Sequence, residues 1–253
     1  MKILISPAKS INEKALKSSD STIPIFQNEA QKIVKNLRKF KVDELKDLMS
    51  ISEDLAQLNS KRYKNWKKST SESEELIKAG FAFSGEVYRG LDISSLSNEE
   101  IEIANKDLRI LSGMYGILKP CDLIYPYRLE MGTRFSPIEE QKNLYEFWKD
   151  KIAKTLKKDL EKEEVIVNLA SNEYFKAIDT QQIKNRIITP VFKEFKNGKF
   201  SIVMMYAKHA RGAMARYLIQ NQLSNIEELK LYNIDGYSFD TNQSNENEWV
   251  FVR

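Results

Sequence analysis

The sequence predicts an α/β fold: a mixed sheet flanked by helices, with antiparallel hairpins near the C-terminus. Short apolar runs typical of strands alternate with longer charged segments that have helical spacing. Two β-rich runs meet at Asn197-Gly198, a strong short-range hairpin signal. The final residues, GYSFDTNQSNENEWVFVR, have the pattern of a second hairpin with a polar loop.

One compact domain is expected for residues 1–253. That length permits one large or two small domains, but no internal repeat or low-complexity linker marks a boundary. Hydrophobic residues make up 42% of the chain and charged residues 30%, which is typical of a globular protein with a sizeable core. The pattern of residues 12–78 is almost wholly helical, so this segment is a possible helical subdomain packed on the sheet.

The strands and helices are predicted as follows. Strands are expected at Lys2–Ser6 (KILIS), Phe81–Ser84 (FAFS), Arg109–Ser112 (RILS), Val165–Ala170 (VIVNLA), Arg186–Lys196 and Lys199–Lys208. Helices are expected at Asn28–Phe40, Val42–Met49, Ser52–Lys68, Ser97–Asn105, Asn143–Leu160 and His209–Leu223. Ser52, followed directly by two acidic residues, is a typical helix start.

Composition excludes several classes of protein. The chain has one cysteine and one histidine, so an intramolecular disulfide and a structural zinc site are excluded. No spacing indicates another metal site, and no cofactor is expected. The N-terminus lacks the apolar run of a signal peptide, and no stretch is long enough to span a membrane. A cytoplasmic protein is therefore expected, and its formal net charge of +4 permits an anionic partner.

Four apolar runs end in small polar residues at a turn. The endings are Ser6-Pro7-Ala8-Lys9, Ser84-Gly85, Ser112-Gly113 and Ala170-Ser171-Asn172. Ligands of open α/β sheets bind outside the carboxyl ends of strands, where free N–H groups favour anions. Together the endings predict a shared anion-binding rim that includes Lys9. The alternative is that Ser and Gly are simply common turn residues.

The stretch LSGMYGILKP, residues 111–120, allows two interpretations. Its Gly113-x-x-Gly116 spacing resembles the hairpin of a helix-hairpin-helix unit, which grips a DNA backbone through main-chain N–H groups. A strand that ends in a glycine turn explains the same pattern equally well. The first interpretation makes both glycines, with Lys119, candidate phosphate contacts.

A basic helix is predicted after the hairpin. Residues 195–226 contain no Asp or Glu. On a helix, Lys208 and Arg211 share a face with Gly212 and Ala215, and these small residues would let a flat anionic surface approach closely. Arg216 adds a further positive charge. The alternative is an ordinary solvated face.

The segment YPYRLEMGTRF, residues 125–135, sets charged groups among aromatic and apolar residues. Arg128 and Glu130 share a face on an extended chain, so Glu130 is expected to hold Arg128 or Arg134 in place. The remaining guanidinium needs another partner, and guanidinium forks suit phosphate oxygens. Both arginines are therefore expected at the edge of the rim.

These segments together resemble one family over essentially the whole chain. The motifs SPAKS, FSGEVYRGLD, LSGMYGILKPCDLIYPYRLEMGTR, NLASNEYFKAI, AKHARGAMARYLI and GYSFD…VFVR occur in the order expected of the bacterial YaaA family of peroxide stress response proteins. The resemblance implies a cytosolic protein that limits peroxide damage by lowering unincorporated iron. It also implies a compact α/β fold with a basic cleft, a helix-hairpin-helix-like element, DNA binding, and no assigned catalytic activity.

Two function classes follow from the sequence. The leading hypothesis is a DNA-binding stress protein that contacts mainly backbone phosphates. The rival is an enzyme acting on a nucleotide or another phosphorylated small molecule, with Glu86, Glu130 and Glu173 as candidate acid/base groups. Under the leading hypothesis these carboxylates only support the basic residues, and no residue is catalytic. The predicted DNA- and phosphate-binding residues are Lys9, Arg89, Gly113, Gly116, Lys119, Arg128, Arg134, Lys208, Arg211 and Arg216.

Overall fold

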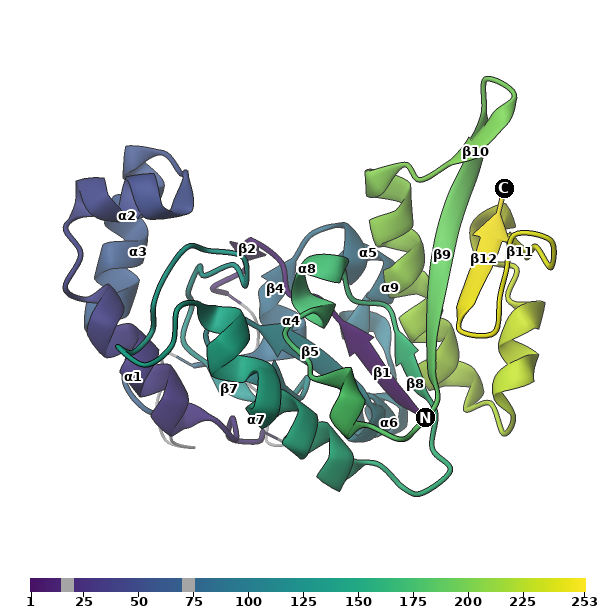
Figure 1. Ribbon diagram of the computed structural model, residues 1–253, viewed down its shortest axis with the longest axis horizontal. Helices are drawn as coiled ribbons and strands as arrows, with labels where there is room; N and C mark the ends of the chain where they lie inside the picture. Colours follow the sequence, from purple (N-terminus) through teal and green to yellow (C-terminus); the bar gives the residue numbers. More distant parts are fainter. Residues whose placement is uncertain (15–20, 70–75) are drawn as a thin grey trace.

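A mixed sheet of eight strands lies at the centre of the protein, as the computed structural model of residues 1–14, 21–69 and 76–253 shows (Figure 1). Seven strands run in the order β11-β12-β9-β8-β1-β5-β6, and β10 pairs with β9 outside that path. The strands are β1 (Lys2–Ile5), β5 (Leu108–Ser112), β6 (Gly116–Leu118), β8 (Ile166–Asn168), β9 (Ile187–Lys196), β10 (Lys199–Ser201), β11 (Ser238–Phe239) and β12 (Glu248–Val252). The predicted fold class is confirmed.

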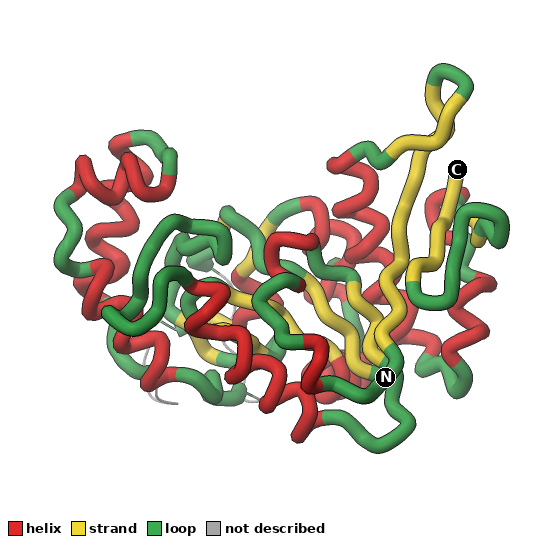
Figure 2. Tube along the Cα trace, viewed as in Figure 1, coloured by secondary structure: helices red, strands yellow, loops and turns green. Residues whose placement is uncertain are grey.

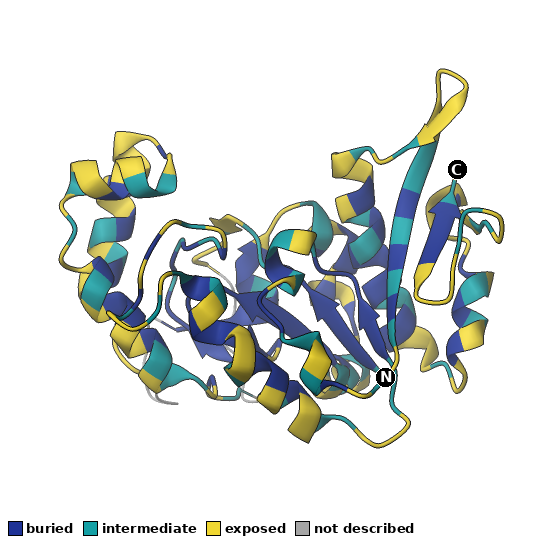
Figure 3. Cartoon of the chain, in the orientation of Figure 1, coloured by how far each residue is buried: buried dark blue, intermediate teal, exposed yellow. Residues whose placement is uncertain are grey.

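The middle of the sheet is parallel and its ends are antiparallel. Strand β1 pairs in parallel with β5 on one side and β8 on the other, and the pairs β8–β9 and β9–β12 are also parallel. Strands β6, β10 and β11 each pair antiparallel with a neighbour. Because helices cover a parallel sheet on both faces, such strands read as unbroken apolar runs. Every residue of β1, β5 and β8 is buried (Figure 3).

The chain leaves β1 and β8 in opposite directions along the sheet. After β1 the next strand of the main sheet is β5, whereas after β8 the next strand is β9, on the far side. A reversal of this kind opens a crevice outside the carboxyl ends of the two strands, and such crevices hold ligands in α/β proteins. The topology therefore places a ligand site beyond Ile5 and Asn168.

Helices flank the sheet and two small ladders extend the fold (Figure 2). The helices are α1 (Gln27–Leu37), α2 (Val42–Met49), α3 (Glu53–Asn65), α4 (Ala79–Ala82), α5 (Glu86–Leu91), α6 (Asn98–Asp107), α7 (Leu144–Asp159), α8 (Asn172–Phe175) and α9 (Met204–Asn221). The ladders pair β2 (Ser10–Ile11) with β4 (Phe83–Ser84) and β3 (Ile77–Lys78) with β7 (Leu123–Ile124). Short 3-10 helices cover Ile93–Ser95, Thr180–Gln182, Ile226–Leu231 and Ile234–Gly236.

Local sequence signals set several helix starts. The hydroxyl of Ser52 accepts a hydrogen bond from the Leu55 backbone N–H at the start of α3. Ser97 forms a capping box with Glu100 at the start of α6. Asn143 accepts from the Glu146 N–H and begins α7. These side chains satisfy N–H groups that have no partner within the helix, so the predicted starts agree with the structure to within one residue.

The helices α1 to α3 gather at one end of the molecule (Figure 1). They belong to the segment 12–78 that the sequence suggests as a helical subdomain, of which residues 15–20 and 70–75 lie outside the described chain. Trp66 is buried and its indole N–H donates to the Tyr115 hydroxyl at 2.8 Å. The Tyr63 hydroxyl donates to the backbone carbonyl of Arg128. The region that contains α3 is thus tied to the centre of the fold near residues 115–128.

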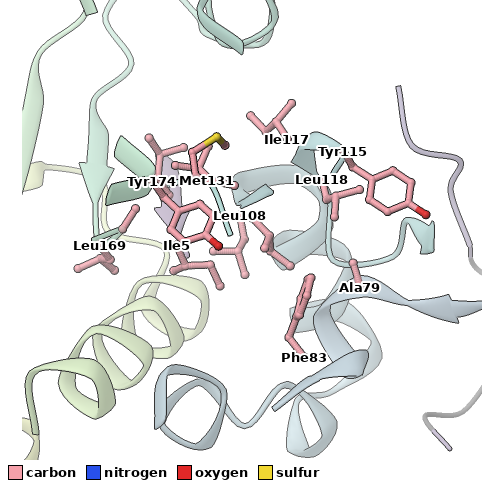
Figure 4. Packing of buried hydrophobic residues seen from close by; sticks show 14 of the residues in the cluster. Ile5, Ala79, Phe83, Leu108, Tyr115, Ile117, Leu118, Met131, Leu169 and Tyr174 are labelled. Carbon is pink, nitrogen blue, oxygen red and sulfur yellow. The ribbon is translucent and has the colours of Figure 1, made fainter. Parts of the chain in front are cut away.

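The core surrounds the parallel strands. Figure 4 shows Ile5 and Leu108 from neighbouring strands beside Leu169, Met131 and Tyr174, all of them buried. Because Leu169 and Tyr174 come from the loop and short helix after β8, this cluster of apolar side chains also packs against the residues that follow the strands. The floor of the crevice therefore rests on packed apolar side chains.

Helices α5 and α9 approach each other closely. A Cβ added to Gly212 would lie 1.8 Å from the Val87 carbonyl oxygen, and one added to Gly90 would lie 2.2 Å from the His209 carbonyl oxygen. Ala215 is also fully buried. The interpretation of Gly212 and Ala215 as an open surface for an anion is therefore wrong. Small residues are required there because two helix backbones meet.

Three other predictions need correction. The predicted strand Phe81–Ser84 begins only at Phe83, because Ala79–Ala82 form the short helix α4. The predicted strand Lys199–Lys208 ends at Ser201, and α9 already begins at Met204. The Gly113-x-x-Gly116 turn joins β5 to β6, two antiparallel strands, so it is not the hairpin of a helix-hairpin-helix unit. Gly116 has φ +69, and a Cβ there would lie 2.6 Å from the Trp148 ring. These glycines serve the turn and its packing.

The glycine contact between α5 and α9 makes a stability prediction. Gly212→Ala should lower the free energy of unfolding by about 3 kcal/mol, the upper end of what overpacking costs, because backbone atoms cannot yield as a flexible side chain does. Urea unfolding measures the change.

The matched control is Gly198→Ala in the hairpin turn. Gly198 has φ +76 but open space around its Cβ position, so only left-handed backbone strain of about 1–2 kcal/mol is expected. Equal destabilisation by the two substitutions would show that the helix contact is looser than described.

Candidate anion-binding site

A cavity of about 310 Å³ lies beyond the carboxyl ends of β1 and β8. Residues after these two strands line it, together with the start of α5, the segment 127–130, the start of α8 and one face of α9. Ser6, Ser84 and Ser171 all contribute to its wall, so three of the four predicted strand endings meet there. Ser112 does not, because it is fully buried beneath and bonds to the Tyr127 hydroxyl.

Glu130 bridges two of the cations that line the cavity. Its carboxylate lies 2.7 Å from the Lys9 Nζ and 3.2 Å from an Arg128 Nη2. Lys9 is largely exposed, whereas the Arg128 side chain is only 17% exposed. The Arg128 Nε is buried and has no hydrogen-bond partner within residues 1–14, 21–69 and 76–253. An unmade hydrogen bond of a buried charged group is costly, so this N–H is suited to a ligand atom inside the cavity.

Helix α9 supplies two further cations, Lys208 and Arg211. Burial lowers the pKa of Arg211, since desolvation disfavours its charged form. Among the described residues no hydrogen bond or ion pair compensates for this cost. A guanidinium held without a partner in a cavity wall is a site prepared for an anion.

Carboxylates share the cavity with these cations. Glu86 accepts from Arg89 Nη1 at 2.8 Å, and its other oxygen lies 3.9 Å from the Nδ1 of His209. Glu173 accepts from the Gly132 backbone N–H at 3.0 Å. With Glu130, three carboxylates face four cations (Lys9, Arg128, Lys208 and Arg211). The lining is thus mixed in sign with a modest positive excess.

Tyrosine hydroxyls in the wall were not predicted from the sequence. Tyr88 donates to the Ser6 carbonyl at 3.1 Å, and Tyr127 exchanges a hydrogen bond with Ser112. Burial raises the pKa of Tyr88, Tyr127 and Tyr174 well above the ordinary tyrosine value. Each hydroxyl therefore stays protonated at neutral pH. The aromatic residues of YPYR and NEYF were the available signal, since both motifs directly flank charged cavity residues.

A second recess of about 710 Å³ adjoins the first. The two share Lys9, Arg128, Glu130 and Glu173, and the second adds Arg134 and the end of α2. Arg134 therefore lies at the outer edge of the site and not in the deep cavity. Arg89 is 71% exposed and pairs with a residue of the cavity wall. The two recesses form one continuous groove, which we call the strand-end groove.

Four predicted phosphate contacts lie elsewhere. Gly113 and Gly116 are buried, and Trp148 donates its indole N–H to the Gly113 carbonyl. Lys119 lies at the amino ends of the parallel strands, where it lines the same recess as Lys2. The chain returns to that end because β6 runs antiparallel to β5. Arg216 donates to the carbonyls of Leu91 and Asp92, which end α5. These hydrogen bonds cap the C-terminal end of α5, so the Arg216 guanidinium already has partners within the protein.

The described part of the chain lacks two kinds of feature. Across residues 1–14, 21–69 and 76–253, no group of three or more His, Cys, Asp and Glu side chains is arranged to hold a metal ion. Over the same residues, no helix combines the length and apolar character needed to cross a membrane.

Comparison with known proteins identifies the family. The sequence model of the family described as "Peroxide stress protein YaaA" matches residues 1–243. The chain belongs to this family. It is 49% identical to a "UPF0246 protein" of Flavobacterium johnsoniae over 254 residues, with both chains fully covered. It is 46% identical to "UPF0246 protein" relatives from Aliivibrio fischeri and Clostridium beijerinckii, covering all of this chain and 98% of each relative.

The charges of the strand-end groove give a second stability prediction. Arg211→Met should leave the free energy of unfolding unchanged or raise it by about 0.5–2 kcal/mol, because it removes a desolvated and unpaired charge. Glu130→Gln should lower it by about 1–3 kcal/mol, because Arg128 loses its charged partner. Urea unfolding at neutral pH measures both variants. Marked destabilisation by Arg211→Met would reveal a partner for that guanidinium and contradict the account.

Proposed function

We propose that this family member is a cytosolic stress protein that binds DNA backbones in the strand-end groove. The observation that carries the proposal is the Arg211 guanidinium, which has no partner among the described residues and faces the same cavity as the Nε of Arg128, which likewise has none there. A fold keeps such costly groups where a ligand completes them. Phosphate oxygens match planar guanidinium donors in geometry and charge.

The distribution of cations supports a polyanion over a single small anion. Lys9, Arg89, Arg134 and Lys208 are exposed around the groove, outside the deep cavity or at its mouth. The helices α2 and α3 on one side and the β9–β10 hairpin on the other project on the side of the strand ends (Figure 1). A strand of nucleic acid lying between these projections would meet exposed cations along its path. Contacts of this kind read phosphates and carry no base information.

The family's link to peroxide stress fits DNA as the protected partner. Iron limitation, which the resemblance implies, is proposed to be an indirect result of DNA binding. One histidine and one cysteine are too few for a soft, high-affinity iron site. Oxygen ligands alone favour harder cations.

Salt dependence tests the proposal. Fluorescence anisotropy with a labelled 20-base-pair duplex should show binding at low salt that weakens steeply as salt rises. The slope of log K against log salt should be about −0.9 per phosphate contacted. Arg211→Ala should weaken binding about tenfold and reduce the slope by about one. DNA binding with a flat salt response, or no binding at low salt, would refute the proposal.

Lys154→Ala is the matched control for this experiment. Lys154 is an exposed lysine of α7 in a separate recess that also contains Lys119. Its removal takes away one positive charge without touching the strand-end groove, so affinity and slope should stay close to those of the unchanged protein. If Lys154→Ala acts and Arg211→Ala does not, DNA is bound on the opposite edge of the sheet.

A second candidate function is an enzyme acting on a nucleotide or another phosphorylated small molecule. The presence of Glu86, Glu130 and Glu173 in the lining of one cavity favours it, since carboxylates serve as acid and base in many sites. The purified protein should be screened against nucleotides and phosphoesters. Reproducible turnover that Glu173→Gln abolishes, with the fold intact by circular dichroism, would establish the enzyme and replace the DNA proposal.

A further inference from the structure

The deep cavity selects a ligand with both acceptors and donors. Arg128 and Arg211 offer N–H groups that an anion satisfies, but the carboxylates of Glu86 and Glu173 face the same space. A bare phosphate meets repulsion from these carboxylates, whereas amino, imino or hydroxyl groups donate to them. The ligand therefore carries an anionic group at one end and hydrogen-bond donors at the other.

The volume and the lining of the cavity further restrict the class of ligand that it can bind. A volume of about 310 Å³ lies at the lower end of small-molecule pockets. It is far too small for a duplex, so a smoothly stacked helix lies across the mouth, where a backbone phosphate reaches Arg128 and Arg211 but no base enters the cavity. Tyr88, Tyr127 and Tyr174 supply aromatic surface to the wall. Aromatic side chains hold planar bases by stacking in nucleic-acid sites.

From these features we propose that the deep cavity binds one nucleotide unit outside a helix, such as a bulged, flipped or terminal nucleotide of a bound DNA strand. Arg128 and Arg211 hold its phosphate, and Glu86 and Glu173 accept from its base or sugar. The inference rests on the proposed DNA-binding function and names the DNA structure that the groove prefers. Enzymes that extrude a nucleotide into a pocket pay unstacking energy, and a bulge removes that cost beforehand.

A bulged duplex tests this directly. The probe is a 20-base-pair duplex carrying a single extrahelical 2-aminopurine, whose fluorescence reports stacking, and the reference is the same duplex fully paired. The protein should bind the bulged duplex about tenfold more tightly than the paired one, in line with the capture of one stacked base. The 2-aminopurine emission should change on binding in the bulged duplex and stay constant in the paired one.

Ser84→Trp is the blocking variant. Ser84 is an exposed residue at the cavity wall in β4, so a large ring there fills the mouth without disturbing the core. It should lower the affinity for the bulged duplex more than the affinity for the paired duplex, so that the ratio of the two affinities falls from about ten to about one. Calorimetry with free deoxyadenosine monophosphate distinguishes a free nucleotide from a nucleotide within DNA as the ligand. If the free nucleotide binds, Ser84→Trp abolishes that binding, and bulged and paired duplexes bind equally, then the cavity holds free nucleotides.

Two results separate failure of this inference from failure of the DNA proposal. Equal affinity for bulged and paired duplexes, with no Ser84→Trp-sensitive binding of the free nucleotide, overturns the nucleotide site while DNA binding stands. No binding of either duplex at low salt overturns the DNA proposal. In that case, calorimetry with free deoxyadenosine monophosphate still shows whether the cavity binds a nucleotide.

Discussion

The parallel pairing of β1 with both β5 and β8 determines where the site and the surrounding helices lie. It sets three buried apolar strands side by side, and it forces the chain to leave β1 and β8 in opposite directions. The crevice between those departures contains Ser6, Ser171 and the residues that follow them. Their mutual hydrogen bonds, 3.2 Å between the two hydroxyls and 2.9 Å from the Ser171 N–H, hold the two loops together.

The charged groups are placed by contacts around that crevice. The close approach of α5 and α9 at Gly90 and Gly212 brings Glu86 and Arg211 to one cavity, although they lie far apart in sequence. Glu130 then compensates Lys9 and one side of Arg128, and leaves the other side of Arg128 without a partner. The fold thus pairs part of the positive charge and retains an unpaired remainder. Unpaired charge of this kind is expected to lower the stability of the folded state, a common trade-off at binding sites, and it is the basis of the proposed anion binding.

Sequence patterns predicted the features that depend on local physics. Apolar runs gave the buried strands, and Ser52, Ser97 and Asn143 marked helix starts, because burial and capping act over a few residues. Errors arose where the outcome depended on distant partners. Gly212 was predicted to lie beside a ligand, because small residues occur both at ligand sites and where two helices pack closely. Only the position of α5, which packs against Gly212, distinguishes the two cases. Lys119 lies at the amino ends of the parallel strands, away from the groove, because β6 runs antiparallel to β5. Arg216 was predicted to bind phosphate, but its hydrogen bonds to the end of α5 link residues far apart in the sequence, so no local pattern indicates them.

The proposed anion site consists of the Arg211 guanidinium and the Arg128 Nε–H, neither of which has a hydrogen-bond partner among the described residues. Nuclear magnetic resonance of arginine side-chain Nε–H groups, recorded while single-stranded or duplex DNA is added, tests it most directly. Arg128 and Arg211 should show the largest shifts and slowed hydrogen exchange, because each gains a phosphate acceptor. Arg216, already bonded to carbonyls at the end of α5, should stay unchanged. Large shifts at Arg216 with Arg128 and Arg211 unmoved would show that the anion is bound elsewhere.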